Sequence, residues 1–301
     1  MWGECQRNMS LYPSSFDPVA DAYFAAWRAV YDAAHPEEWT RDAFARQATA
    51  RAAFREAAEV LKAAAEPGNP EIWHAAAHAA EYADRDDEAA LRWERKAAAA
   101  GLPAAMVNLA LALRREEAHN AEAIQWLERA AALGFARAMT FMGFAYRDGH
   151  GVAEDFPTAA AWFRRAVEAG DSHALVLLGR LLALLMDRHE EGLSILLKAA
   201  EAGHRDAFVF LADLYADRHS PVHDPVEALK WYHRVAETGG PGSAARAMLE
   251  LSNRYRDGIG TPPNRAKARE WLVQHAENLL QGSPGQRKAE QALAKFDAEL
   301  F

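Results

Sequence analysis

The strongest constraint on the fold is a motif that recurs along the chain at a nearly constant spacing. The segment AIQWLERAAALG (123–134) returns as AAWFRRAVEAG (160–170) and as ALKWYHRVAETG (228–239), and each copy ends in glycine. The closing glycines are Gly68, Gly101, Gly134, Gly170, Gly203 and Gly239, which lie 33, 33, 36, 33 and 36 residues apart. A period of this length predicts one helical hairpin per repeat and therefore an all-α fold.

The spacing of apolar residues within each repeat predicts two helices. Small or apolar residues follow each glycine at positions +4, +8, +9 and +12, as in Ala138, Met142, Gly143 and Tyr146 after Gly134. These positions share one helix face, and a glycine or alanine at +9 lets a neighbouring helix approach closely. The closing glycine is expected to end the second helix in the left-handed conformation.

The second helix carries a large residue eight positions before its closing glycine. The recurring tryptophans at this position are assigned to the core, and they are Trp93, Trp126, Trp162, Trp231 and Trp271. Trp271 follows Trp231 by 40 residues, which implies four inserted residues. We place them in the segment GGPGS (239–243), which is read either as a loop that contacts a partner or as a tolerated change of length.

One repeat resembles a known family. The segment ARAMTFMGFAYRDGHGVAEDFPTAAAWFRRAVEAG (136–170) resembles a Sel1-like repeat, a relative of the tetratricopeptide repeat. The matching positions are Ala138, Met142, Gly143, Tyr146, Gly149, Gly151, Val152, Ala159, Trp162, Phe163, Ala166 and Gly170. The loop signature returns as YRDGIGT (255–261), and the resemblance is strong over 121–276 and weaker over 57–120. The units after Gly68, Gly101 and Gly170 lack the Gly-x-Gly loop and look closer to tetratricopeptide hairpins.

The resemblance implies a right-handed α-solenoid that binds another protein or peptide in its concave groove. We expect four segments: a flexible N-terminus (1–16), an N-terminal helical cap (17–56), the repeat array (57–276) and a C-terminal capping helix (277–301). Terminal caps cover apolar faces that the last repeats would otherwise expose.

Members of the family are adaptors or immunity-type inhibitors, so we expect a non-enzymatic bacterial scaffold whose partner is a protein such as a toxin or effector. The bacterial origin rests on arginine being far commoner than lysine, 27 against 7. An enzyme, either a hydrolase or a metal-dependent one, with a histidine-containing groove site is the first alternative. A structural protein that assembles with copies of itself is the second alternative.

Composition excludes several other classes. Lys plus Arg number 34 and Asp plus Glu number 43, so a net charge of −9 argues against general binding of nucleic acid or anionic membrane. The most apolar stretch, Ala174 to Met186, contains Arg180 and is shorter than the roughly 20 residues that span a bilayer. Cys5 is the single cysteine, so no internal disulfide or thiolate zinc site is expected. The N-terminus lacks the apolar core of a signal peptide, which predicts a cytoplasmic protein starting at Met1 or Met9.

The search for catalytic chemistry finds only weak patterns. His74 and His78 lie four residues apart in HAAAH, with Glu81 following, but HExxH and a third nearby histidine are absent. We therefore favour surface or groove histidines over a metal site. His219, His223 and Asp224 are similarly read as a polar loop. GxSxG, SxxK, KTG and GxxxxGK[ST] are absent, so we predict no enzyme activity, no metal and no cofactor.

The concave groove of such an array is lined by the first helix of each hairpin, at positions +3, +7 and +10. The residues expected there are Arg137, Phe141, Phe144, His173, Leu177, Arg180, Asp206, Phe210, Asp213, Arg246, Glu250 and Asn253, with Ala104, Asn108 and Leu111 in an earlier unit. Aromatic side chains flanked by Arg and Asp are typical of binding hot spots. Phe141, Phe144, Leu177 and Phe210 are equally read as side chains that fill gaps between hairpins, and both interpretations stay open.

Overall fold

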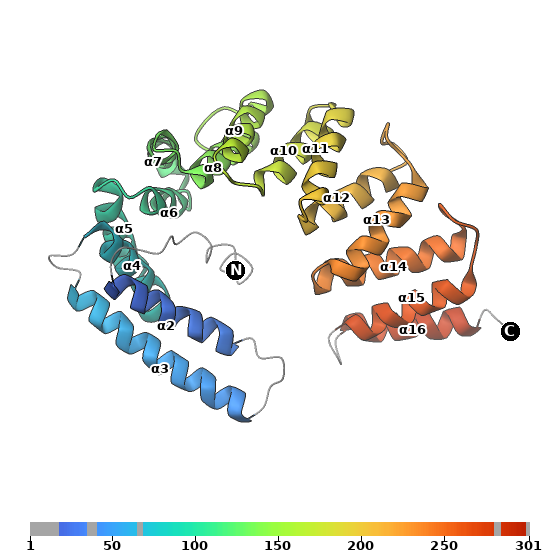
Figure 1. Ribbon diagram of the computed structural model, residues 1–301, viewed down its shortest axis with the longest axis horizontal. Helices are drawn as coiled ribbons and strands as arrows, with labels where there is room; N and C mark the ends of the chain where they lie inside the picture. The colour runs from blue at the N-terminus through green and yellow to red at the C-terminus, as the bar shows by residue number, and fades with distance from the viewer. Residues whose placement is uncertain (1–17, 35–40, 65–68, 280–283, 299–301) are drawn as a thin grey trace. The chain divides into compact units, whose positions relative to one another are not determined.

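The computed structural model describes residues 18–34, 41–64, 69–279 and 284–298 (Figure 1). Within these ranges every regular element is helical and no strand occurs, which confirms the predicted all-α fold. Consecutive helices pack against each other as hairpins, in the manner of an α-solenoid. The expected flexible N-terminus (1–16), Cys5 and Gly68 lie outside the described residues.

The chain divides into two compact units, Met1–Ala169 and Gly170–Phe301. Unit 1 contains three complete hairpins that follow a pair of N-terminal helices. Its elements are α2 (Pro18–Ala34), α3 (Arg41–Ala64), α4 (Pro70–Ala79), the π-helix η1 (Ala80–Asp84), α5 (Asp87–Ala99), α6 (Pro103–Leu113), the 3-10 helix η2 (Glu117–His119), α7 (Asn120–Ala132), α8 (Ala136–Asp148) and α9 (Phe156–Glu168).

Unit 2 contains three hairpins and a terminal helix. Its elements are α10 (Ala174–Leu185), α11 (His189–Glu201), α12 (Arg205–Ala216), α13 (Pro225–Thr238), α14 (Pro241–Asp257), α15 (Arg265–Asn278) and α16 (Pro284–Ala298). Phe296 of α16 is buried in the same apolar core as Leu272 of α15. At the other end of the chain, α3 continues through residue 56, so the expected boundary between cap and array falls inside a helix.

Of the repeat positions predicted to be buried in α8, +4, +8 and +9 are buried, whereas Tyr146 at +12 is half-buried. Ala138 and Met142 have no exposed surface. A Cβ added to Gly143 would lie 2.5 Å from Cε1 of Phe163, so α8 and α9 approach closely because residue 143 is glycine. The period of the sequence therefore predicted both the helices and the face of each that packs.

The core assignment of the tryptophans is wrong in detail. Trp126 and Trp162 are only half-buried, and the guanidinium groups of Arg129 and Arg165 lie 4.8 and 4.1 Å from their ring centroids. The deeply buried residue is the next one along the chain, which is Glu94, Leu127, Phe163, Leu196, Tyr232 or Leu272. At Trp93, Trp126 and Trp162 the indole lies at the edge of its hairpin, with a cation over the ring and part of the ring packed on the protein.

The closing glycines behave as predicted at four repeats and differently at a fifth. Gly101, Gly134, Gly170 and Gly203 have φ between 81° and 99°, the left-handed conformation. Gly239 instead has φ −69° and an extended backbone.

The inserted segment GGPGS is also not a loop. Pro241 is the first residue of α14, which is 17 residues long, whereas α8 has 13. Four residues add about one helical turn, so the insertion lengthens α14 and leaves its buried face close to register. Proline is well suited to the first helical position because the amide it lacks has no partner there.

Candidate functional site

The predicted groove residues of unit 2 lie on the first helices of its hairpins, and several contact one another. The guanidinium of Arg180 on α10 lies 3.9 Å from the ring centroid of Phe210 on α12. Nearer the start of the same helices, His173 Nδ1 lies 4.0 Å from a carboxylate oxygen of Asp206. Phe210 is half-buried, so it packs on the core and keeps part of its ring in reach of solvent. The register therefore brings both charges and an aromatic ring to one pair of helices.

Asp213 connects this group to the next hairpin. Its carboxylate accepts hydrogen bonds from the Tyr232 hydroxyl at 3.0 Å and from Arg246 Nη2 at 2.5 Å. Burial, followed by the charge of Asp213 and its hydrogen bond, raises the pKa of Tyr232, so the hydroxyl stays protonated and donates. The hydrogen bond to Asp213 likewise raises the pKa of Arg246. Asp213 thus holds a tyrosine and an arginine in fixed positions.

Two members of this group escaped the sequence analysis. Tyr232 follows a tryptophan, at a position where most repeats place an apolar residue. Arg254 of α14 is buried, with its guanidinium 4.9 Å from the Tyr232 ring centroid. Its Nε and Nη1 have no hydrogen-bond partner among the described residues. The signal that would have found both is a polar group in a register that the other hairpins fill with apolar side chains.

The remaining predicted residues of unit 2 divide by exposure. Glu250 and Asn253 of α14 are half-buried, and Glu250 adds to the negative potential that raises the pKa of Tyr232. Leu177 is 8% exposed, which favours its interpretation as a side chain that fills the packing between hairpins. We call the other eight residues the α10–α12–α14 face, and they are His173, Arg180, Asp206, Phe210, Asp213, Arg246, Glu250 and Asn253.

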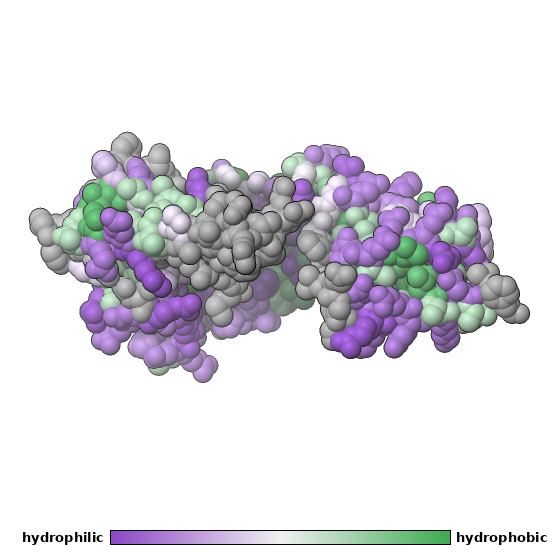
Figure 2. All heavy atoms as spheres, turned by 90° about the horizontal axis from the view of Figure 1, so that it is seen from below, coloured by the Kyte–Doolittle hydropathy of each residue, from purple (hydrophilic) through white to green (hydrophobic). Residues whose placement is uncertain are grey.

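This face is not an apolar patch. Seven of its eight residues are polar or charged, and Phe210 is the one apolar side chain. On the side of the molecule that Figure 2 shows, the visible part of unit 2 is likewise mostly hydrophilic around a small hydrophobic patch. The large apolar side chains exposed on the described part of unit 2 are Leu184, Leu185, Val226 and Leu249, and none was predicted to line the groove. The groups that this face offers are therefore charged and polar side chains and one aromatic ring.

The predicted residues of unit 1 form a row of rings and cations on α8. Arg137 lies over Phe141 at 5.4 Å, and Phe141 meets Phe144 edge-on at 5.9 Å. Phe144 also meets the buried ring of Phe163 edge-on at 5.5 Å, which is a packing contact within the hairpin. Both Phe141 and Phe144 are half-buried, so each has a packing role, and their contact with a partner stays a prediction.

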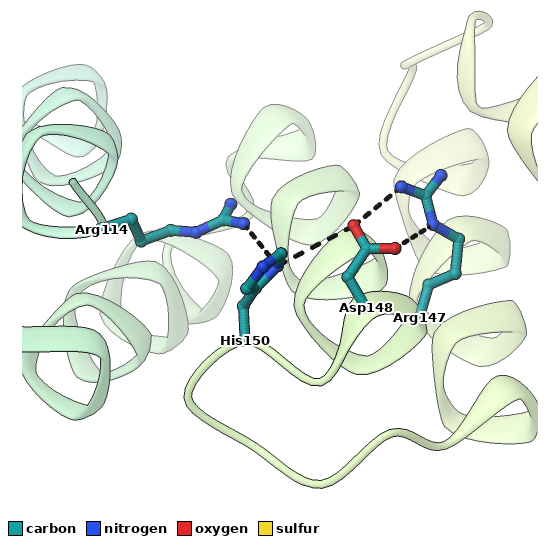
Figure 3. Close-up of polar contacts among 4 residues, drawn as sticks. All are labelled: Arg114, Arg147, Asp148 and His150. Carbon is teal, nitrogen blue, oxygen red and sulfur yellow. Dashed lines mark hydrogen bonds and ion pairs between the residues drawn. The ribbon is translucent and has the colours of Figure 1, made fainter. Parts of the chain in front are cut away.

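The Gly-x-Gly loop after α8 carries a cluster of polar contacts (Figure 3). Asp148 accepts hydrogen bonds from Arg147 Nε and Nη2 at 2.6 and 2.8 Å, and these bonds hold the pKa of Asp148 below its usual range. His150 lies 3.9 Å from Asp148 and receives a 3.0 Å hydrogen bond from Arg114, which caps α6. The cluster ties this turn between α8 and α9 to the preceding hairpin.

The histidines considered as metal ligands are used in packing. His74 and His78 are buried, so the expectation of surface or groove histidines is wrong. His74 Nδ1 donates to Glu94 at 2.8 Å, and His78 Nδ1 shares a 2.7 Å hydrogen bond with the Tyr23 hydroxyl. No group of three or more His, Cys, Asp or Glu among the described residues is placed to hold a metal ion.

The loop before α13 also uses its polar residues structurally. Asp224 caps α13 by accepting hydrogen bonds from the amides of Val226 and Glu227 at 2.9 and 3.1 Å. His219 contacts Asp217 by both its backbone and its ring. These contacts are those of a polar turn. Separately, no helix in the described ranges combines the length and apolar character needed to cross a membrane.

Comparison with known proteins agrees with the repeat register. A model of the Sel1 repeat matches six segments, which are residues 79–102, 103–135, 136–171, 173–204, 209–239 and 245–278. The chain belongs to the Sel1 repeat family. Proteins of this family are generally non-enzymatic scaffolds for protein–protein interaction.

Two solved structures share this architecture, and a third relative matches part of the sequence. The crystal structure of a Sel1 repeat protein from Oxalobacter formigenes is 27% identical, covers 70% of this chain and 89% of that one, and has a TM-score of 0.53. A protective antigen present in uropathogenic Escherichia coli strains has a TM-score of 0.53 at 21% identity, over 86% of this chain and 69% of that one. An exopolysaccharide production negative regulator from Rhizobium leguminosarum bv. viciae is 35% identical over 99 residues, which are 30% of this chain and 37% of the regulator.

Proposed function

We propose that this protein binds a partner protein non-catalytically through the α10–α12–α14 face. The observation that carries the proposal is the stacking of Arg180 on the half-exposed Phe210, next to the Asp213–Arg246 pair. Arginine and aromatic residues dominate the energy of protein interfaces, particularly where neighbouring residues hold them in place. Asp213 supplies that preorganisation, because it fixes Tyr232 and Arg246 before any partner arrives.

The chemistry of the face favours a partner segment of mixed charge. Arg180 and Arg246 offer guanidinium groups to carboxylates, whereas Asp206 and Glu250 offer carboxylates to basic side chains. Phe210 supplies the one large ring among them. Such a surface selects a complementary pattern of charges rather than any apolar sequence.

The role we favour is that of a regulatory adaptor. The relative from Rhizobium leguminosarum is named as a negative regulator, and regulation without catalysis requires only a complementary surface. The immunity-type role also needs no more than such a surface, and it remains a prediction from the resemblance.

The test compares Phe210→Ala with a matched apolar change outside the face. Leu184→Ala is the control, because Leu184 is on α10, is exposed and was not predicted to contact a partner. Partners are first captured from the native host lysate with the wild-type chain, and the purified partner is then titrated against each variant. We expect Phe210→Ala to weaken binding by about tenfold or more and Leu184→Ala to leave it unchanged.

Two results would contradict the proposal. Equal affinity of wild type and Phe210→Ala would place the partner on another surface. If the wild-type chain binds no protein directly, the scaffold role is contradicted. A self-assembling or catalytic role would then be favoured.

A further inference from the structure

A polar cavity of about 200 Å³ lies in unit 1, whereas the α10–α12–α14 face belongs to unit 2. Trp27, His78 and Tyr82 line it with aromatic rings. Its polar lining comprises the carboxylates of Glu81, Asp87 and Glu94, the amide of Asn108 and the guanidinium groups of Arg115 and Arg137. Asn108, Leu111 and Arg137 were predicted to line a groove, and they border this cavity.

Glu94 is the residue that sets this hairpin apart. The corresponding position in the other hairpins holds Leu127, Phe163, Leu196, Tyr232 or Leu272. Glu94 is 8% exposed, and its two carboxylate oxygens accept hydrogen bonds from His74 Nδ1 at 2.8 Å and Asn108 Nδ2 at 3.0 Å. Burying a carboxylate costs free energy that hydrogen bonds or an opposite charge must compensate. Leucine at the same position of other hairpins meets the packing requirement without that cost. Glu94 therefore needs an explanation other than packing.

The aromatic wall is rigid and uncharged. The rings of His78 and Tyr82 stack with centroids 4.3 Å apart, and Trp27 meets His78 edge-on at 4.8 Å. Burial lowers the pKa of His78 to about 3, so its ring is neutral at physiological pH. Tyr82 is 40% exposed, which places an accessible ring at the edge of the cavity. Faces of such rings attract cations.

The backbone is irregular where these side chains converge. Glu81 and Tyr82 belong to η1, a π-helical turn that interrupts the hairpin, and Arg85 follows it with a positive φ of 59°. Inserted π-turns are frequent at functional sites because they redirect side chains that an α-helix would space evenly. Here the turn coincides with the cavity wall.

The charges around the cavity leave an excess of carboxylates. Arg115 contacts both Glu81, at 3.8 Å, and Asp87, at 3.4 Å. Arg137 lies over the ring of Phe141. The pKa of Glu81 is raised, chiefly by burial and further by the charges of Asp87 and Glu94, although Arg115 opposes the shift. A positive ligand would relieve this repulsion, whereas an anion would add to it.

We propose that this cavity binds an alkylguanidinium or alkylammonium group carried by an arginine or lysine side chain of the partner protein. The cavity is smaller than the 300–1,000 Å³ typical of drug-sized ligands, and it suits a single side chain. Glu94 receives the cation, and Trp27 and Tyr82 contact its aliphatic and charged parts. The proposal rests on the proposed function, since it assigns the chemistry of one partner residue.

The first experiment uses small probes with the full chain. N-acetyl-arginine methylamide and its neutral analogue N-acetyl-citrulline methylamide have nearly the same shape, and NMR shifts of the Trp27 indole N–H report their binding. We expect the arginine probe to bind with a Kd on the order of 1 mM and the citrulline probe at least tenfold more weakly. Equal binding of the two probes, or no binding of the arginine probe, would overturn the proposal.

Variants connect the probe to the named residues. Glu94→Gln keeps the shape and the bond from Asn108 but removes the charge, and it should weaken the arginine probe about tenfold. Tyr82→Ala gives an independent variant, because its ring is partly exposed and its loss spares the buried network. Unchanged probe affinity in a folded Glu94→Gln protein, or in Tyr82→Ala if Glu94→Gln fails to fold, would rule out this site.

The last arm identifies where the cation comes from. If Glu94→Gln also weakens the captured partner, the basic group belongs to that partner. If it weakens only the probe, the site takes a free cationic small molecule, and the assignment to the partner is wrong. Phe210→Ala tests the proposed function separately, because it should leave the arginine probe unaffected.

Discussion

The hairpins α4–α5 and α8–α9 follow the same register but bury different chemistry. Phe163 of α9 has no exposed surface and packs on Gly143 and Phe144. Glu94 occupies the same position on α5, is almost as deeply buried, and is bonded to His74 and Asn108. The repeat therefore demands that this position be buried, while the group placed there decides whether a hairpin only packs or also holds a polar cavity.

The largest expected effect comes from substituting Phe163, the buried apolar residue of the α8–α9 hairpin. Phe163→Ala should destabilise unit 1 by about 3–5 kcal/mol, because it removes a fully buried ring and leaves a cavity. Urea unfolding followed by circular dichroism gives the measurement. Trp162→Ala is the control and should cost clearly less, since Trp162 is half-buried; equal losses would contradict the register.

A smaller effect tests how α8 and α9 approach. Gly143→Ala should cost about 1–3 kcal/mol, because the new Cβ would lie 2.5–2.9 Å from three atoms of the Phe163 ring. The hairpin α6–α7 combines alanine and leucine at these two positions, Ala110 and Leu127. Phe163→Leu should therefore relieve part of the cost of Gly143→Ala in a double-mutant cycle. Strictly additive losses would show that the two residues are not in contact.

The polar hairpin should differ from the apolar one in its response to acid. Burial lowers the folded-state pKa of His78 to about 3, so the unfolded chain binds the proton more readily. The titration of His78 therefore leaves the unfolding free energy unchanged above pH 6.5. Between pH 6.5 and 3 it lowers the unfolding free energy by about 1.4 kcal/mol for each unit that the pH falls.

The unfolding free energy of wild type and His78→Phe, measured from pH 7 to 5, checks this expectation. As pH falls, the unfolding free energy of wild type should decrease more steeply than that of His78→Phe. Phe163→Leu is the control, because the substitution changes no titratable group. Its unfolding free energy should depend on pH as steeply as that of wild type. Parallel pH profiles for wild type and His78→Phe would mean that folding does not lower the pKa of His78.

The sequence predicted the features that all repeats share, but it did not predict those in which a single repeat differs from the others. Regular spacing of small and apolar residues determined the hairpins, the buried face of α8 and the close approach at Gly143, because these depend on periodic packing. Comparison of the repeats marks Glu94, Tyr232 and Arg254 as polar residues in a mostly apolar register. Their bonding partners come from other helices, so the sequence alone does not show what they contact. The lengthening of α14 was missed because GGPGS reads as a loop, although Pro241 is well suited to start a helix.

The smallest expected effect concerns the Gly-x-Gly loop, which α8–α9 has and α4–α5 lacks. Asp148→Asn should lose the ionic contact with Arg147 and the nearby His150, at a cost of about 0.2–1 kcal/mol that shrinks at high salt. Asp257 pairs with Arg256 in the same way, at 2.7 and 2.8 Å. Among the residues that the structure describes, no histidine contacts Asp257 as His150 contacts Asp148, so Asp257→Asn is the matched control.

Thermal unfolding of both variants at low and high salt separates the two contributions. A larger loss for Asp148→Asn would mean that His150 and Arg114 reinforce the loop, as their 3.0 Å hydrogen bond suggests. Equal losses would assign the whole effect to the Arg–Asp pair that both loops share. The loop would then be a local turn whose polar cluster adds little, and the difference between the two hairpins would reside in their buried residues alone.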